Sequence, residues 1–482
     1  MRILAILIVS SCVAVSSFAA IAKTGNIVLK RSTMEGRVPM SMDAVSLSGG
    51  SEPEILQKPS GGSATIATST FNLAKSVIGA GVLSLPSGVA FLADEPSALV
   101  PAAALCTLFG IVAAYSFSAI GRICKENNAQ SFQEAWEKLV SPNSAWLISG
   151  SITALCFLAS LAYCIIMGDS FSSLFQTFQL PALVSERSNT ILAMSALVLL
   201  PLCSLKSLSA LAPFSLLGLG GTLYTAIFMM IRYMDGSYAE GGQFFSDIAI
   251  KPSFSARGGY SIASFNAFVL VSMMSTSFVA HYNAPTFMNE LKDATVPRFN
   301  QVVNGGFIAA ILLFIFVMSV GFMTFGGNSL GFVLNNYSNK DILATVARFA
   351  IGLALITGFP FTFSALRNGV LDLAKLKGPS RDNAFTPVTV AGLALLTGLA
   401  LVLKDVGFVV SISGAMFGCA VMFIIPAIMN IANIKLNAKK FGSEMTSGNK
   451  IEVAGNYGMM LTGIAMAIVG VSVSVLREMG KL

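Results

Sequence analysis

The chain has 482 residues, of which 54% are hydrophobic and 11% are charged, and its mean hydropathy is +0.75. A soluble chain of this length would carry roughly 25% charged residues, so the composition argues against a set of soluble domains and indicates one polytopic domain in a lipid bilayer. The formal net charge is +7, but the basic residues cluster between apolar runs, as topology determinants do, and we expect no nucleic-acid partner.

The N-terminal region has the features of a targeting sequence. Residues 1–20 contain Arg2, an apolar stretch and then small residues, which is typical of a cleavable signal peptide. Residues 21–62 are first basic and then rich in Ser, Gly and Pro, and predict a transit segment and disordered tail. This two-part pattern resembles the targeting sequences of algae with secondary plastids. We expect a plastid membrane location, with a vacuolar, other endomembrane or plasma-membrane location as the alternative.

Residues 63–478 predict an all-α membrane domain with eleven transmembrane helices, because about 20 apolar residues suffice to span a bilayer. The candidate spans are 66–92, 97–121, 145–168, 189–205, 209–232, 262–288, 301–325, 341–366, 386–403, 406–430 and 456–476. Lys and Arg are more frequent after the even-numbered spans, which predicts that those loops lie on the cytosol-like, or cis, side. The sequon Asn336-Tyr337-Ser338 falls in a predicted outer, or trans, loop and is a candidate glycosylation site.

The first span is interrupted by the run Ile78-Gly79-Ala80-Gly81, which is followed by Pro86. Inside a bilayer, irregular backbone survives only beside protein or a wet cavity. The interruption therefore predicts a helix that opens around a polar ligand.

The sixth span contains a second interruption, at Ser277, Phe278, His281, Asn283 and Pro285. Interruptions at corresponding positions of two halves indicate a transporter built from inverted repeats. We expect spans 1–5 and 6–10 to form a five-plus-five inverted repeat with discontinuous helices 1 and 6, followed by one extra C-terminal helix.

These two breaks together suit a zwitterion such as an amino acid. A half-helix N-terminus presents free N–H groups and partial positive charge to a carboxylate, while freed carbonyl groups can accept from an ammonium. The predicted substrate-binding residues are Ile78, Gly79, Ala80, Gly81, Ser277, Phe278, His281 and Asn283.

The motifs around both breaks resemble those of a known family. The run Asn72–Pro86 matches Asn-Leu-x-Lys-x-x-Ile-Gly-x-Gly-x-Leu-x-Leu-Pro, and the run His281–Asp293 contains His-x-Asn followed by Asn-Glu-Leu-Lys-Asp. Together they resemble the amino acid/auxin permease family, with its vacuolar and sodium-coupled neutral amino acid branches closest in the second run. The resemblance covers roughly residues 63–478. It implies the five-plus-five fold and a substrate between spans 1 and 6, with help from spans 3 and 8.

Three residues are candidates for coupling to an ion. Lys75 stands where sodium-coupled members of the family tend to have asparagine, so the resemblance implies an ammonium in place of sodium and coupling to protons. The alternative is a lysine that snorkels to the interface. His281, the only histidine, either carries a coupled proton or is structural. Thr357, at a predicted kink of span 8, is the third candidate. Arg348, in the same span, is predicted as an interfacial anchor or as a gate partner for an acidic residue.

We therefore predict a secondary active transporter of amino acids, proton-coupled, that works by alternating access. The alternatives are a sodium-coupled carrier, an amino-acid sensor with little flux, and a channel. The sequence has no enzymatic motif, so we expect no enzyme, and it suggests no cofactor and no metal site.

Overall fold

The computed structural model describes residues 62–205, 215–254, 266–440 and 445–480. This part of the chain is all-helical and contains no strand, with isolated bridges at Ala64–Leu291 and Ser253–Gly326. The all-α prediction is confirmed over these residues. The predicted signal peptide, 1–20, and the tail, 21–62 apart from Gly62, lie outside the described residues.

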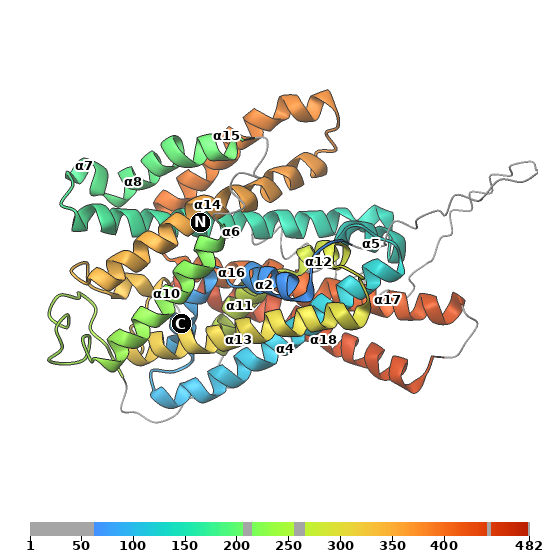
Figure 1. Cartoon of the computed structure of the whole chain (residues 1–482), viewed down its shortest axis with the longest axis horizontal. Coiled ribbons are helices and arrows are strands. Elements are labelled where there is room, and N and C mark those ends of the chain that lie inside the picture. The colour runs from blue at the N-terminus through green and yellow to red at the C-terminus, as the bar shows by residue number, and fades with distance from the viewer. Residues whose placement is uncertain (1–61, 206–214, 255–265, 441–444, 481–482) are drawn as a thin grey trace, which may run out of the picture.

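The helices follow the order of the predicted spans (Figure 1). In the first half they are α2 Ile66–Val77, η1 Ala80–Ser84, α3 Leu85–Leu92, α4 Leu99–Glu126, α5 Phe132–Leu139, α6 Trp146–Thr177, α7 Ala182–Ser185, α8 Arg187–Ala193, the π-helical η4 Met194–Leu199, α9 Leu200–Cys203 and α10 Ser215–Met234. In the second half they are α11 Ala267–Phe278, η6 His281–Asn283, α12 Ala284–Glu290, α13 Val296–Phe325, η7 Val333–Asn336, α14 Ile342–Leu373, α15 Pro379–Val402, α16 Val406–Ser413, the π-helical η8 Gly414–Gly418 and η9 Ala420–Ile424, α17 Ile425–Lys440 and α18 Ser447–Glu478.

Within the described residues, seven helices are long and apolar enough to cross a membrane, or eight if the bent pair α2–α3 is counted as one span. The segment Arg187–Cys203, which contains α8, η4 and α9 and overlaps the predicted fourth span, is apolar but shorter. The predicted tenth span continues beyond 430 to Lys440 at the end of α17. A multi-pass membrane protein is therefore the observed architecture.

The helices pack in two groups. In the first, α13 packs against α2, α3 and α4, α11 packs against α3, and α12 packs against α4. In the second, the long helices α6 and α14 lie against each other, and α15 and α8 pack against α6. The helices α10 and α16 each contact both groups, since α10 packs against α13 and α14, and α16 packs against α11 and α6.

Polar contacts show that loops after odd-numbered spans lie together at one end of the bundle, and loops after even-numbered spans at the other. At one end, Arg232 Nη2 lies 2.8 Å from Asp341 Oδ1, and the Asn335 amide donates to Asp169 Oδ2 at 2.8 Å, which joins the loops after predicted spans 3, 5 and 7. At the other end, the Asn289 amide donates to Gln130 Oε1 at 3.1 Å, and an Asn127–Asn433 hydrogen bond of 2.9 Å adds the loop after span 10. This alternation agrees with the predicted order of the loops, and we keep the names trans and cis for these two ends.

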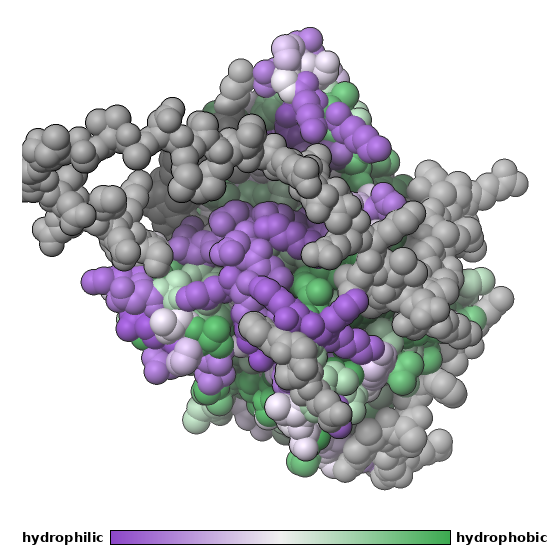
Figure 2. All heavy atoms as spheres, turned by 90° about the vertical axis from the view of Figure 1, so that its right-hand side faces the viewer, coloured by the Kyte–Doolittle hydropathy of each residue, from purple (hydrophilic) through white to green (hydrophobic). Residues whose placement is uncertain are grey.

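The cis end is polar. Figure 2 faces the end of the molecule where α5, α12 and α17 lie in Figure 1, and hydrophilic side chains gather across its middle. The connector α5 begins at an N-cap, because Ser131 Oγ accepts from Glu134 N–H. A hydrogen bond from Lys138, with one from the backbone N–H of Gln130, lowers the pKa of the Glu134 carboxyl. The connector is amphipathic, with Phe132, Ala135, Trp136 and Leu139 buried and its charged side chains on the other face, which suits the boundary of a membrane protein.

The trans loop after α13 corrects two predictions. Asn336 is 3% exposed, and its amide accepts from Leu330 N–H and donates to Asn328 O, so the folded sequon has no room for a glycan. Arg348 is 2% exposed and is no interfacial anchor. Its guanidinium donates to the carbonyl groups of Leu334, Tyr337 and Ser338. Among the described residues, no carboxylate oxygen lies within 4.0 Å of this guanidinium. Arg348 instead holds the η7 loop against α14.

Candidate functional site

The first predicted break is present and bends the chain by 43°. α2 ends at Val77, Gly79 is extended (φ −109°, ψ −177°), and η1 begins at Ala80. Side chains replace some of the lost helical hydrogen bonds, since Ser84 Oγ donates to Gly81 O at 2.7 Å. Pro86 is the second residue of α3, where a missing N–H costs nothing because the first helical N–H groups have no partner.

The second break repeats this arrangement. α11 ends at Phe278, Val279 is extended, and the short turn η6 precedes α12. Pro285 is again the second residue of the second half-helix. Proline at this position starts α12 and does not kink a continuous helix.

The two breaks touch each other. A Cβ atom at Gly81 would lie 3.2 Å from Ser277 Oγ, so the glycine backbone rests directly against the end of α11. The Asn283 amide donates to Ser76 Oγ at 3.2 Å. Residues about 200 positions apart therefore meet at one place, as expected for a site shared by both broken helices.

A cleft of about 180 Å³ opens beside the first break, between α2, α6, α10 and α14. It is lined by Lys75, Ser76, Ile78, Gly79, Tyr163, Gly218, Leu219, Thr222, Ile351, Ala354, Leu355 and Gly358. Lys75 carries the only charge among these lining residues and is half-buried. An ammonium on the wall of an intramembrane cleft is a functional candidate because a charge there is costly.

Two predicted residues point elsewhere. The Phe278 ring is buried against α13, with its centroid 4.7 Å from that of Phe314. His281 is fully buried, its Nε2 lies 2.7 Å from Ser116 Oγ and 3.0 Å from Ala113 O, and its ring packs edge-on to Phe117. Among the described residues its Nδ1 has no hydrogen-bond partner. These contacts tie the second break to α4, on a side different from the Lys75 cleft.

The remaining predicted residues lie close to the cleft. Thr357 is buried next to Gly358, and its hydroxyl donates within its own helix, to Leu353 O and Ala354 O. Ala80 starts η1 beside Gly79. The structure thus brings Lys75, Ile78 and Gly79 together on one wall, joins Gly81 to Ser277, and joins Asn283 to Ser76.

Sequence reasoning missed part of the cleft. Tyr163 on α6 reaches the first break, since a Cβ at Gly79 would lie 3.9 Å from its hydroxyl oxygen. Thr222 and Gly218 on α10 form another wall. Contributions from spans 3 and 8 were expected from the family resemblance, but none from span 5. The glycines Gly218, Gly220 and Gly221 could have indicated this contribution, because small residues let membrane helices approach closely.

Comparison with known proteins identifies the family. A family model described as transmembrane amino acid transporter protein matches residues 62–475. The chain belongs to this family. The predicted resemblance to amino acid/auxin permeases is confirmed. This member of the family is a multi-pass membrane protein of amino acid transport and not an enzyme.

Relatives of this transporter include proteins named for different ions and membranes. It is 24% identical to the putative sodium-coupled neutral amino acid transporter 11 of Danio rerio, over 85% of this chain and 87% of that one. It is 28% identical to the vacuolar amino acid transporter 7 of Saccharomyces cerevisiae, over 63% of this chain and 58% of that one. Vacuolar amino acid transporter 5 of Schizosaccharomyces pombe is 24% identical over 76% of this chain and 84% of its own length.

A solved structure has the same fold. The crystal structure of MhsT in complex with L-phenylalanine superposes with a TM-score of 0.53, covering 84% of this chain and 98% of that chain at 15% identity. This likeness concerns the fold alone.

Proposed function

We propose that this protein is a secondary active transporter that moves amino acids, coupled to protons, by alternating access. The observation that carries the proposal is the meeting of two broken helices at Gly81 and Ser277, beside a cleft whose one charged lining residue is Lys75. Broken half-helices next to an intramembrane cleft offer backbone groups to both charges of a zwitterion. The substrate would contact Ile78, Gly79, Ala80 and Gly81 from the first break, and Ser277 and Asn283 from the second. Phe278 and His281, which pack against α13 and α4, would position the second break.

The pattern of the breaks supports a five-plus-five inverted repeat within eleven spans. Each half begins with a 12-residue helix, α2 or α11, followed by a short turn and a half-helix with proline in its second position. The third span of each half contains a 32-residue helix, α6 or α14, and the two pack together. We assign α18 as the extra helix. The transport domain would then be residues 63–478, as the sequence predicts.

The two packing groups supply a physical route to alternating access. Both broken helices belong to the group around α13, whereas Tyr163 and Gly358 of the cleft belong to the group of α6 and α14. A substrate between them would contact both groups. A rocking motion of one group against the other would then expose it to one side at a time.

Lys75 and Thr357 are the groups that we propose for ion coupling. Lys75 lines the cleft between α2 and α14, and Thr357 lies one residue from the lining residue Gly358. An ammonium at this position would occupy the place of a sodium ion and exclude it. Because the named relatives include putative sodium-coupled transporters, sodium coupling is the alternative. A proton role for His281 stays a prediction, although its contacts favour the positioning of the second break.

The test is uptake into proteoliposomes that contain the purified full chain. A panel of amino acids is offered with a pH gradient, with a sodium gradient, and with neither. Saturable accumulation driven by the pH gradient alone is the expected result. Accumulation that requires sodium would support the sodium-coupled carrier, binding without flux would support the sensor, and fast unsaturable flux would support a channel.

We also propose an internal membrane as the location. Vacuolar relatives support an endomembrane, and the composition of residues 1–62 supports a plastid membrane reached through the secretory route. Imaging a C-terminally tagged full chain against plastid and vacuolar markers separates the two, and a signal at the cell surface alone would contradict both.

A further inference from the structure

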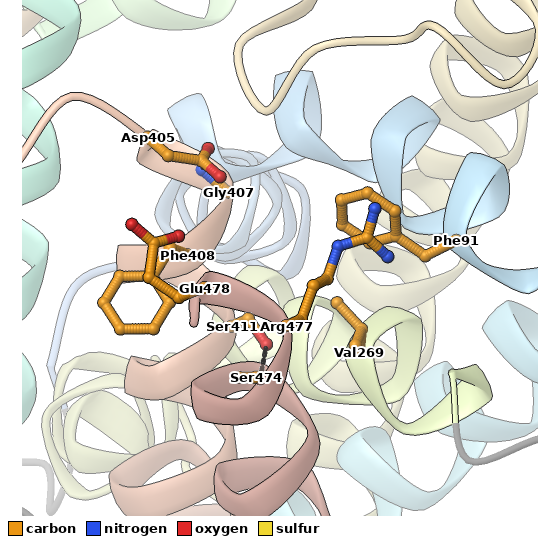
Figure 3. Close-up of a pocket in the computed structure, with 9 residues that line it drawn as sticks. All are labelled: Phe91, Val269, Asp405, Gly407, Phe408, Ser411, Ser474, Arg477 and Glu478. Atoms are coloured by element: carbon orange, nitrogen blue, oxygen red, sulfur yellow. Dashed lines mark hydrogen bonds between the residues drawn. The ribbon is translucent and has the colours of Figure 1, made fainter. Parts of the chain in front are cut away.

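A second cleft lies at the trans end, outside the contact between the two breaks (Figure 3). It has a volume of about 130 Å³ and lies between α3, α11, α16 and α18. Its trans position follows from Asp405, at the start of α16. A Cβ at Gly331, in the trans loop after α13, would lie 2.4 Å from Asp405 Oδ1.

One side of this cleft carries an arginine without a carboxylate partner. The Arg477 guanidinium carbon lies 3.2 Å from the centroid of the Phe91 ring, as Figure 3 shows. No carboxylate oxygen of the described residues lies within 4.0 Å of this guanidinium. The aromatic face therefore holds a planar cation whose N–H groups can pair with an acid group in two parallel hydrogen bonds.

The opposite side carries two carboxylates. Asp405 and Glu478 lie across the cleft from the guanidinium in Figure 3. Asp405 Oδ1 accepts from Gly407 N–H at 2.8 Å, which orients the carboxylate at the N-terminus of α16. Both side chains are exposed at the mouth, where a cationic group could reach them from the trans side.

The interior of the cleft is built of buried side chains. Val269 and Phe408 are buried and provide apolar walls. The hydroxyl oxygens of Ser411 and Ser474 lie 2.5 Å apart, in a hydrogen bond that links α16 to α18. The cleft therefore has a positive side, a negative side and an apolar interior.

We propose that this cleft binds a dipolar ligand with one acid group and one primary ammonium. The acid group pairs with Arg477, and the ammonium pairs with Asp405 and Glu478. The ligand comes either from a free apolar amino acid or from the headgroup of an ethanolamine phospholipid. Because Phe91 lies in the second half of the first broken helix, the bound ligand changes the contact between α3 and α18. This site stands independently of the transport mechanism proposed above.

The experiment uses the purified full chain in nanodiscs and two probes. The first probe is radiolabelled L-leucine at equilibrium. The second is phosphatidylethanolamine, compared by native mass spectrometry with phosphatidylcholine, whose methylated ammonium cannot donate hydrogen bonds. Arg477→Gln is expected to weaken retention of one probe at least about tenfold, the scale of a lost hydrogen bond to a charged group. Glu478→Gln, at an exposed position, is expected to weaken retention of the same probe. Arg381→Gln, which changes a half-buried arginine outside the cleft, is the matched control.

The pattern of results decides both the site and the source. Loss of leucine binding identifies the amino acid, and loss of phosphatidylethanolamine retention identifies the lipid. Wild-type retention of both probes in folded Arg477→Gln and Glu478→Gln would overturn the proposal. If Arg477→Gln is not folded, so that it fails to elute from size-exclusion chromatography as a single species, the Glu478→Gln result alone tests the proposal. Gly79→Leu fills only the central cleft beside the first break. If probe binding is lost in Glu478→Gln but persists in Gly79→Leu, the trans cleft is a separate site. This result holds even if no transport is found.

Discussion

Gly81 of the first broken helix and Ser277 of the second lie in direct contact, with little room for a side chain on the glycine. A Cβ atom at Gly81 would lie 3.2 Å from Ser277 Oγ and 3.8 Å from Ser277 Cα. By contrast, a Cβ at Gly79 would meet only the Tyr163 hydroxyl, at 3.9 Å. The two glycines of one motif thus have different roles, since Gly81 permits helix contact and Gly79 keeps the cleft open.

Alanine substitutions should separate these roles. Gly81→Ala is expected to destabilise the protein by about 1–3 kcal/mol, the usual cost of overpacking, and to lower uptake. Adding Ser277→Ala removes the crowded hydroxyl and should restore part of the loss. Gly79→Ala should keep thermal stability and weaken substrate affinity instead. The measurements are thermal denaturation in detergent and the KM of uptake, and equal effects of the two single substitutions would contradict this division.

Lys75 is expected to determine the driving ion. Lys75→Ala should lower accumulation driven by a pH gradient at least about tenfold, because it removes a charged hydrogen-bonding group from the cleft. Lys125→Ala, at an exposed cis position, is the matched control and should transport normally. Sodium-dependent uptake that survives Lys75→Ala would count against proton coupling through this residue.

For His281, the buried contacts predict a positioning role. His281→Ala should lower thermal stability by about 1–3 kcal/mol, because the Ala113 carbonyl loses a donor in the interior. His281→Gln keeps an amide near the position of Nε2 and should recover part of this stability. Both variants that fold should keep the pH profile of wild-type uptake. A profile that flattens in His281→Gln would instead support a coupled proton on the imidazole.

Arg348 should prove important for the trans loop. Arg348→Ala leaves buried carbonyl groups at Leu334, Tyr337 and Ser338 without their donors, at about 1–3 kcal/mol for each unsatisfied group. We expect a clear fall in thermal stability, read by fluorescence size-exclusion chromatography, and faster proteolysis of the loop. Arg381→Ala breaks an exposed ion pair with Asp372 and should have little effect. Similar stability of the two variants would show that the carbonyl contacts carry little energy.

The sequon at Asn336 should remain unmodified in the folded protein. Its amide bonds to Leu330 and Asn328 inside the loop, so a glycan would displace both contacts. Expression in a eukaryotic host followed by glycosidase digestion should give no mobility shift. Asn336→Gln should lower thermal stability, and a glycosidase-sensitive band that disappears in this variant would show that the site is used.

The amino-acid sequence by itself determined the membrane class, the positions of both helix breaks and the family. These features depend on local composition, since a bilayer requires long apolar runs and penalises open backbone wherever glycine and proline interrupt them. Gly79 and Gly81, Pro86 and Pro285 therefore marked the breaks without knowledge of any tertiary contact. The order of the loops was also readable, because basic residues concentrate after alternate spans.

Only the tertiary structure decided which way the side chains of these motifs point. His281 and Lys75 belong to equally clear motifs, yet the helix packing turns the imidazole toward α4 and the ammonium toward α10 and α14. Tyr163 and Thr222 entered the cleft from spans with no break. Arg348, at an apparently interfacial position, was buried by a loop that folds back over α14. Local sequence determines where a helix opens, whereas the direction of each side chain depends on packing between segments far apart in the chain.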